Sequence, residues 1–181
     1  MGHCLVSSEP IIVNDICNSL IMSFQDKVNP AKVGGMKSKV DEDIRSTKVY
    51  PLDIQENQQL YAGIAEYCNR MNDDHWNFKL EGMDKLQFLL YEQGDHYNWH
   101  LDLGKGKHAT RKLSFVIPLS SEESYEGGEL LIKIADKDIV VPLKQGHAIL
   151  FPSYILHKVT PVTKGKRYML VGWMKGKTPF A

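Results

Sequence analysis

Apolar residues recur at helical spacing in residues 14–25. Ile16, Leu20 and Phe24 lie at positions i, i+4 and i+8, which places them on one face of a helix. Asn14 comes just before this run, where an asparagine side chain can cap the first turn. The pattern predicts an amphipathic helix that buries this face against the rest of the protein.

A second amphipathic helix is predicted over residues 56–73. Its apolar positions are again three or four residues apart and form one face, made of Leu60, Ile64, Tyr67, Cys68 and Met71. The intervening residues 26–53 are rich in Gly, Pro and charge, which is typical of a loop. One extended segment, residues 47–52, is predicted to be an edge strand.

From about residue 76 the pattern changes to short apolar runs separated by Gly, Pro or charged turns. About eight strands are predicted, at 78–82, 85–94, 112–120, 128–134, 138–143, 148–153, 156–162 and 167–173. Short strands after a helical preface are typical of a mainly β protein with N-terminal helices. We expect a double-stranded β-helix core (a jelly roll, cupin-like), with the helices on the outer face of one sheet.

Length and composition indicate one domain and narrow its class. With 181 residues and 43% hydrophobic content, residues 1–181 should form a single domain. Residues 1–75 would be its helical preface and edge strands, and residues 76–175 its jelly-roll core. The 22 basic and 22 acidic residues balance, so no overall field favours nucleic acid or a membrane as partner. The three cysteines lack CxxC spacing and no long apolar run occurs, so we expect a cytoplasmic protein.

The segment YNWHLDLG, residues 97–104, places His100 and Asp102 two positions apart in a predicted strand. Because strand side chains alternate between faces, the imidazole and the carboxylate should point to the same side. Such a pair alone is most often an ordinary hydrogen bond, but a jelly roll can bring His157 from a later strand beside it. Two imidazoles and one carboxylate leave three octahedral positions of a metal open, which is typical of non-heme iron(II) oxygenases. A structural zinc site would need a fourth protein ligand.

Arg167 follows His157 by ten residues, in a strand whose neighbours are mostly apolar. A buried guanidinium needs an anionic partner. If no carboxylate of the protein supplies it, the carboxylate of a ligand can, because the guanidinium fork binds carboxylate through two hydrogen bonds.

The order HxD, a distal histidine and then a basic residue about ten positions later resembles the 2-oxoglutarate- and iron(II)-dependent dioxygenases. The segments LQFLLYEQGDHYNWHLD, YEGGELLI and QGHAILFPSYILHKVTPVTKGKRYMLVGW are similar to the prolyl 4-hydroxylase type. They are most similar to its bacterial subgroup, the PKHD-type hydroxylases. The resemblance covers nearly all of residues 76–175. It implies hydroxylation of an unactivated C–H bond, such as that of a prolyl residue in a protein or peptide, with release of succinate and CO2.

Carried over residue by residue, the resemblance implies that His100, Asp102 and His157 bind Fe(II). Arg167 would hold the distal carboxylate of 2-oxoglutarate. Tyr91 matches a tyrosine that hydrogen-bonds this co-substrate, although a tyrosine there is equally a core residue. Dioxygen is the other implied co-substrate, and L-ascorbate is the expected reductant.

Other co-substrate contacts are less defined by the resemblance. Tyr97 matches a second family tyrosine at the wall of the site. Related hydroxylases can place a further polar contact on the strand after the HxD loop, where this chain has Ser114, Val116 and Pro118 on one face. The full set of hydrogen bonds to the co-substrate therefore stays open.

Two rival classes stay open. A metal-binding jelly roll without catalysis, acting as a sensor or structural module, needs neither open coordination positions nor a carboxylate anchor. A zinc hydrolase with the same three ligands would have no use for Arg167. Nucleic-acid demethylation is disfavoured, because AlkB-type relatives carry a second arginine after the co-substrate one, and no Arg follows Arg167.

The remaining conspicuous residues have simpler interpretations. Trp99 should face away from the metal and pack in the core. Gly127 and Gly128 predict a hairpin turn with positive φ. The basic loop 104–112 would form a rim that favours an acidic substrate, or it is merely solvated, or the acidic segment 120–129 neutralises it. Three further histidines are expected to be loop or structural residues and not ligands: His96, His108 and His147.

Overall fold

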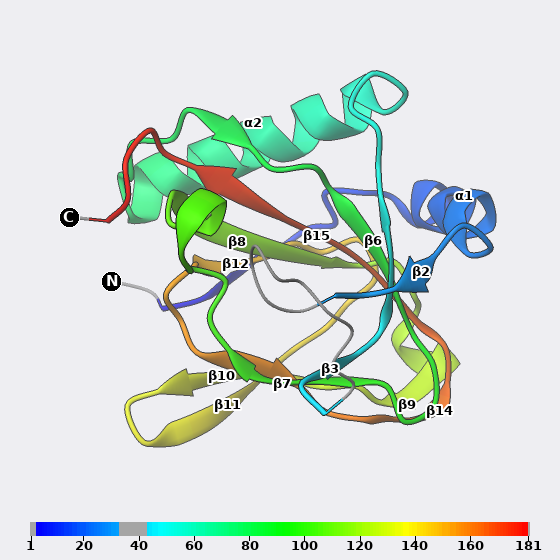
Figure 1. Cartoon of the computed structure of the whole chain (residues 1–181). Helices are drawn as coiled ribbons and strands as arrows, with labels where there is room; N and C mark the ends of the chain where they lie inside the picture. Colours follow the sequence, from blue (N-terminus) through cyan, green and yellow to red (C-terminus); the bar gives the residue numbers. More distant parts are fainter. Residues whose placement is uncertain (1–2, 33–42, 181) are drawn as a thin grey trace.

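The computed structural model describes residues 3–32 and 43–180, which form two facing β-sheets with both helices on one side (Figure 1). The larger sheet runs β1 (Leu5–Val6), β12 (Ile149–Pro152), β8 (Arg111–Pro118), β15 (Arg167–Lys175), β6 (Gln87–Tyr91), β4 (Lys48–Pro51), β2 (Asn29–Pro30), and β5 (Gly82–Met83) pairs with β15. The smaller sheet runs β11 (Lys137–Val141), β10 (Leu130–Ile134), β13 (His157–Val159), β7 (His96–His100), β3 (Arg45–Ser46). A ribbon joins β14 (Val162–Gly165) to β9 (Tyr125–Gly127). Neighbouring strands pair antiparallel, which confirms the predicted jelly roll.

Helices α1 (Asn14–Phe24) and α2 (Gln58–His75) cover the outer face of the larger sheet, as predicted (Figure 1). Phe24, Ile64 and Cys68 from the helices share one buried cluster with Phe88 and Leu170 from the sheet. Two short 3-10 turns, η1 (Gly106–His108) and η2 (Glu122–Ser124), lie in loops. Neither helix of the described chain has the length and apolarity needed to cross a bilayer.

Strand β15 is buried on both faces, which explains why its sequence lacks a simple alternation of apolar and polar residues. Tyr168, Leu170 and Met174 belong to the cluster beneath the helices. Met169 belongs to a second cluster, between the two sheets. Since Arg167 alternates with Tyr168, its side chain enters the space between the sheets. The strand thus places one cation inside the jelly roll.

The first helix differs from its prediction in its start and in its buried face. It begins at Asn14, so Val13 occupies the N-cap position and no side chain caps the helix there. Ile16 is 48% exposed, whereas Cys17 is fully buried and Phe24 is buried as predicted. Apolar spacing fixes a helix stripe only to within about one residue. Docking on the sheet selected Cys17 in place of Ile16.

Three strand predictions were wrong in detail. Residues 47–52 contain β4, but β2 pairs with its outer side, so β4 is not the edge strand. Residues 78–81 of the predicted strand over 78–82 form no strand, and only the two-residue β5, Gly82–Met83, begins at its end. Gly127 and Gly128 have the predicted positive φ, 72° and 63°, but they link β9 and β10, which belong to different sheets. They do not form a hairpin.

Candidate metal centre

One aspartate and two histidines from distant parts of the chain meet between the sheets. His100 ends β7, and His157 begins β13 directly opposite it in the antiparallel register. Asp102 lies two residues beyond β7. Its Oδ1 is 3.8 Å from His100 Nε2, and its Oδ2 is 3.6 Å from His157 Nε2. Asp102 does not lie in the strand where the sequence predicted it, because β7 ends at His100, yet the bend at Asp102 still turns its carboxylate toward both imidazoles.

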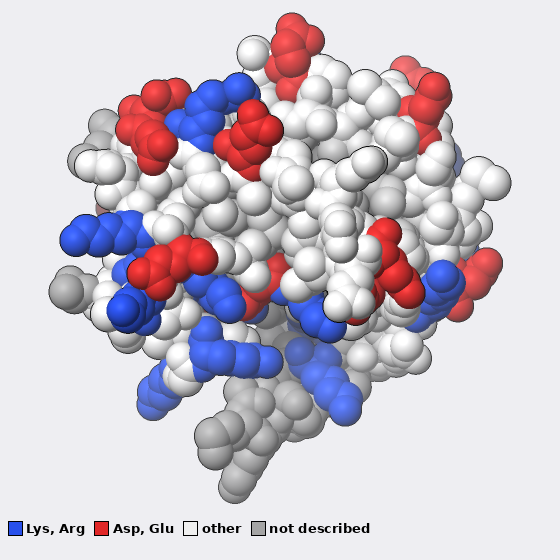
Figure 2. Space-filling view, turned by 90° about the horizontal axis from the view of Figure 1, so that it is seen from above, with Lys and Arg blue, Asp and Glu red and all other residues white. Residues whose placement is uncertain are grey.

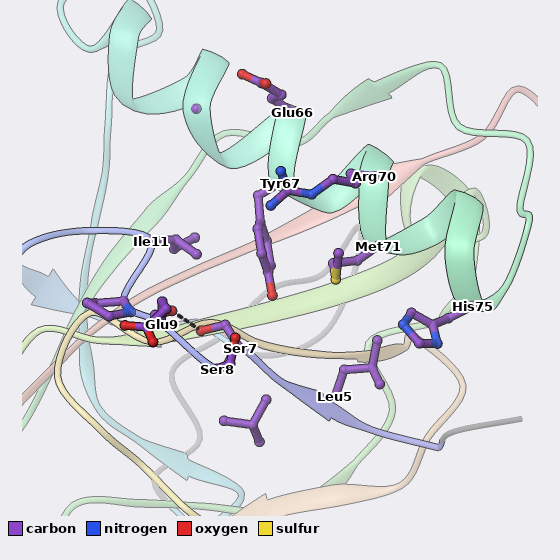
Figure 3. Close-up of a pocket in the computed structure, with 13 residues that line it drawn as sticks. Leu5, Ser7, Ser8, Glu9, Ile11, Glu66, Tyr67, Arg70, Met71 and His75 are labelled. Atoms are coloured by element: carbon purple, nitrogen blue, oxygen red, sulfur yellow. Dashed lines mark hydrogen bonds between the residues drawn. The ribbon is translucent and has the colours of Figure 1, made fainter.

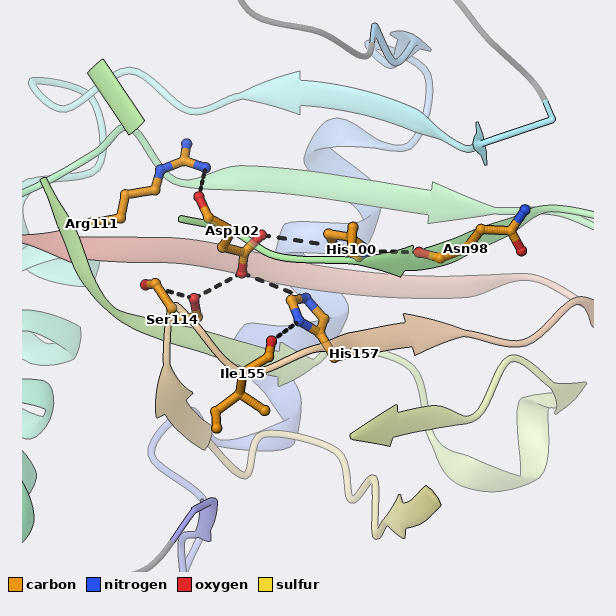
Figure 4. Close-up of polar contacts among 8 residues, drawn as sticks. Asn98, His100, Asp102, Arg111, Ser114, Ile155 and His157 are labelled. Carbon is orange, nitrogen blue, oxygen red and sulfur yellow. Dashed lines mark hydrogen bonds and ion pairs between the residues drawn. The ribbon is translucent and has the colours of Figure 1, made fainter. Parts of the chain in front are cut away.

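Backbone carbonyls orient both imidazole rings (Figure 4). His100 Nδ1 lies 2.7 Å from the carbonyl oxygen of Asn98, and His157 Nδ1 lies 2.9 Å from that of Ile155. A carbonyl only accepts, so each Nδ1 carries the hydrogen and donates it. The lone pair is then on Nε2, the atom that faces Asp102. Both rings are therefore held in the tautomer that binds a metal through Nε2.

A pair of buried serines orients the carboxylate. Ser114 Oγ donates to Asp102 Oδ2 at 2.8 Å, and Ser153 Oγ lies 3.0 Å from Ser114 Oγ (Figure 4). Because Ser114 has given its only hydrogen to Asp102, Ser153 is the donor in the second bond. The sequence placed Ser114 on one face of its strand but gave no sign that it contacts Asp102, and it did not single out Ser153. No local pattern links residues 39 positions apart.

The ionisation states also suit a cation. Burial alone raises the pKa of Asp102, but His157, His100 and hydrogen bonds from Trp173 and Ser114 outweigh it, so the pKa lies below its ordinary value. Burial and the neighbouring His157 lower the pKa of His100 to about 3, which keeps that ring neutral at neutral pH. The donor atoms of His100, Asp102 and His157 lie within 4.8 Å of one another, in the one such group among residues 3–32 and 43–180. The donor set fits iron(II) with open coordination positions.

Arg167 lies in the same space, and no anionic group of the described residues pairs with it. It is only 1% exposed, and its Nε has no hydrogen-bond partner among those residues. None of the ion pairs within the described chain includes it. Its guanidinium lies 4.9 Å from the ring of buried Tyr91, its partner in the cross-strand register. From the sequence, Arg167 was expected to bind a ligand carboxylate if no carboxylate of the protein neutralises it. Among the described residues, none does.

A cavity of about 640 Å³ joins the metal-ligating group to Arg167. Leu89, Met169 and Val171 give it apolar walls, and Trp173 also lines it. Tyr97 stacks on His100 with ring centroids 3.4 Å apart and limits that ring's movement. Tyr91 and Tyr97 both line the cavity, where sequence analysis expected them, and their roles toward a co-substrate stay predictions.

The other aromatic and histidine residues lie apart from the metal-ligating group. Trp99 faces away, as predicted, but it is half-buried on the outer face and not in the core, with the ammonium groups of Lys133 and Lys158 at 5.1 and 4.8 Å from its ring. His147 Nδ1 lies 2.9 Å from the Ser7 carbonyl oxygen and is structural, as expected. His108 lines the cavity without joining the group of metal donors.

A second cavity, also of about 640 Å³, lies between residues 5–11 and α2 (Figure 3). Tyr67, Arg70 and His75 of the helix line it, and the Arg70 guanidinium lies 5.5 Å from the Tyr67 ring. Because α2 covers the outer face of the larger sheet, this cavity is separate from the metal-ligating group. No cluster of three metal donors occurs in it among the described residues.

Comparison with known sequences finds relatives over the jelly-roll core. The profile of the 2OG-Fe(II) oxygenase superfamily matches residues 86–175. A PKHD-type hydroxylase of Synechococcus sp. is 45% identical over 95 residues, which are 50% of this chain and 43% of that protein. A PKHD-type hydroxylase of Idiomarina loihiensis is 30% identical over 131 residues, 68% of this chain and 60% of that protein. The chain spans about half the length of the curated relatives that it matches.

Solved structures share the fold at low sequence identity. A Pseudomonas putida prolyl-4-hydroxylase matches with a TM-score of 0.78 and 22% identity, covering 97% of this chain and 93% of that one. A Trichoplax adhaerens prolyl hydroxylase was solved with a peptide fragment of the hypoxia inducible factor oxygen degradation domain. It matches with a TM-score of 0.82 and 16% identity, covering 97% of this chain and 84% of that one. The matched residues 86–175 contain the whole His–Asp–His group and Arg167. The chain therefore belongs to the 2OG-Fe(II) oxygenase superfamily and, within it, to the PKHD and prolyl 4-hydroxylase type.

Proposed function

We propose that this chain is a 2-oxoglutarate- and Fe(II)-dependent dioxygenase that hydroxylates an unactivated C–H bond in a residue of a protein or peptide, such as a proline. One observation carries the proposal: a single cavity holds a group of three metal donors and a buried guanidinium with which no carboxylate of the described residues forms an ion pair. The co-substrate 2-oxoglutarate has two matching ends, a 2-oxo acid that chelates metals and a distal carboxylate. The peptide seen with the Trichoplax adhaerens enzyme of the same fold supports a peptide substrate.

Each polar residue of the cavity has a distinct task in this proposal. His100, Asp102 and His157 hold the iron, and Arg167 pairs with the distal carboxylate of 2-oxoglutarate. Tyr91, beside Arg167, donates a hydrogen bond from its hydroxyl to the co-substrate. When bound, the iron supplies the activation of dioxygen, coupled to decarboxylation of 2-oxoglutarate to succinate and CO2. L-ascorbate is the proposed reductant that keeps the metal ferrous.

The rest of the cavity holds these groups in place and limits water. Ser114 fixes the carboxylate of Asp102, so the ligand does not have to reorient when the metal arrives. Apolar side chains, Leu89, Met169 and Val171, line the space between Arg167 and the metal donors. An ion pair between Arg167 and a carboxylate in such surroundings is stronger than one in water.

The direct test is an anaerobic titration of metal-free protein, first with Fe(II) and then with 2-oxoglutarate. Chelation of the 2-oxo acid by the metal should produce a weak visible charge-transfer band. Arg167→Ala should require a much higher 2-oxoglutarate concentration for the same band, whereas Arg70→Ala, in the second cavity, should match the wild type. If iron-loaded, folded wild-type protein gives no band, the proposal is wrong, and a metal-binding module without catalysis becomes the better interpretation.

A further inference from the structure

Basic side chains crowd the cavity that holds the metal-ligating group. Among the described residues, its lining includes six of them and a single carboxylate, Asp102. The basic residues are Lys32, Arg45, Lys105, Lys107, Arg111 and Arg167. Figure 2 shows Lys and Arg side chains gathered around a hollow in one face of the molecule. This local excess contrasts with the overall balance of 22 basic and 22 acidic residues.

Two of these cations have an assigned partner. The proposed function gives Arg167 to the co-substrate, and Arg111 Nε donates to Asp84 at 2.9 Å. The other four, Lys32, Arg45, Lys105 and Lys107, form no ion pair within the part of the chain that the structure describes.

Several lysines elsewhere on the surface do find carboxylates. Glu92 accepts from both Lys48 and Lys166, and Glu126 pairs with Lys164. Glu126 belongs to the acidic segment 120–129, which the sequence offered as a neutralising partner for the basic loop 104–112. No ion pair joins these two segments among the described residues. Lys105 and Lys107 therefore remain available to an anionic ligand.

Three of the four cations without an ion pair among the described residues flank the two ends of β7. Arg45 lies opposite Tyr97, near the start of the strand, and its guanidinium is 4.8 Å from the Tyr97 ring. Lys105 and Lys107 follow its end, three to seven residues beyond the metal-ligating His100 and Asp102, and both are exposed. The Arg45 Nε is buried and has no hydrogen-bond partner among the described residues. A ligand that crosses the opening would meet positive charge on both sides of the metal-ligating group.

We propose that the substrate is an acidic peptide, with Asp or Glu on both sides of the residue that is hydroxylated; this inference rests on the proposed function. Carboxylates on the two flanks would neutralise the cations at the two ends of β7, and they would steer the peptide toward the opening. The guanidinium of Arg45 offers the flank nearer Tyr97 a bidentate contact. Lys105 and Lys107 offer the other flank two point charges.

A single-stranded nucleic acid is a poorer fit than a peptide. Proteins that bind such strands combine basic grooves with aromatic rings on which the bases stack. The aromatic rings of this cavity are already covered: Arg111 lies 3.6 Å from the Trp173 ring, Arg45 lies over Tyr97, and Arg167 lies over Tyr91. Phe115, the fourth, is buried. The cavity therefore offers charge without a stacking platform.

The test compares two labelled peptides of equal length, one a repeat of Glu-Pro-Glu and the other of Lys-Pro-Lys, by fluorescence anisotropy with the iron-free protein. The acidic peptide should bind more tightly, and its affinity should fall as salt is raised. Lys105→Glu/Lys107→Glu should weaken its binding about tenfold or more. The matched control is Lys137→Glu/Lys144→Glu, two exposed lysines that do not line the cavity, and it should change binding by less than about twofold. Equal binding of the two peptides, or equal loss in both variants, would overturn the inference.

The anaerobic charge-transfer band separates this inference from the proposed function. A normal band in wild type, without preference for the acidic peptide, rejects the acidic substrate and leaves the dioxygenase standing. Tight binding of the acidic peptide by a protein that gives no band rejects the dioxygenase and retains the anion-binding surface. A single-stranded oligonucleotide that displaces the acidic peptide at lower concentration than unlabelled peptide would overturn the peptide assignment.

Discussion

Replacing Ser114 with alanine should weaken Fe(II) binding without unfolding the protein. Ser114 Oγ donates to Asp102 Oδ2 at 2.8 Å, and Ser114 is 1% exposed, so water cannot easily take over this bond. A hydrogen bond to a charged group contributes about 1.5–3 kcal/mol. Loss of a partner that orients a metal ligand typically lowers metal affinity by about 10- to 100-fold. We expect the same range for Ser114→Ala, because Trp173 remains as a donor to the carboxylate.

The assay is an anaerobic Fe(II) titration of metal-free protein, in competition with a chelator of known affinity. The matched control is Ser120→Ala. Ser120 is also buried, at 4% exposure, but it accepts from the backbone N–H of Tyr168 and donates to the Lys166 carbonyl, away from Asp102. Ser120→Ala should lower the free energy of unfolding and leave Fe(II) affinity unchanged. Wild-type Fe(II) affinity in Ser114→Ala, or an equal loss in both variants, would refute the reasoning.

Two further predictions concern the co-substrate side and the edge of the cavity. Gly128→Ala should weaken 2-oxoglutarate binding, measured by the anaerobic band, because a Cβ there would lie 2.7 Å from Arg167 Cδ. The control is Gly106→Ala, because the φ of Gly106 (61°) is close to that of Gly128 (63°) but no atom lies within 4 Å of a Cβ added there. This variant should lose roughly 1 kcal/mol of stability and keep its co-substrate affinity. Burial raises the pKa of Asp84, but its two basic partners outweigh that effect and hold it below its ordinary value. Its contribution to stability is therefore present above about pH 4 and lost as the pH falls through the lowered pKa. The difference in urea midpoint between wild type and Asp84→Asn should shrink from pH 7 to pH 3, and a constant difference would contradict this.

Features that depend on local spacing could be predicted from the sequence. The helical repeats located both helices, and the short apolar runs indicated an antiparallel jelly roll. The sequence also identified, as candidate site residues, all four that meet between the sheets: His100, Asp102, His157 and Arg167. Their chemical types were informative because charged and metal-ligating side chains are rare in otherwise apolar strands.

Contacts that join distant segments became apparent only from the folded chain. Ser114 and Ser153 stand behind Asp102 because β8 and β12 pair in one register, which no local pattern encodes. The helix periodicity allowed Ile16 or Cys17 to face the core, and packing on the sheet made the choice. Whether Arg167 and the cations near β7 find carboxylates likewise depends on which loops lie within ion-pair distance of them. Charge neutralisation is a property of three-dimensional neighbours, so the open anion-binding sites of this protein became visible only in the folded chain.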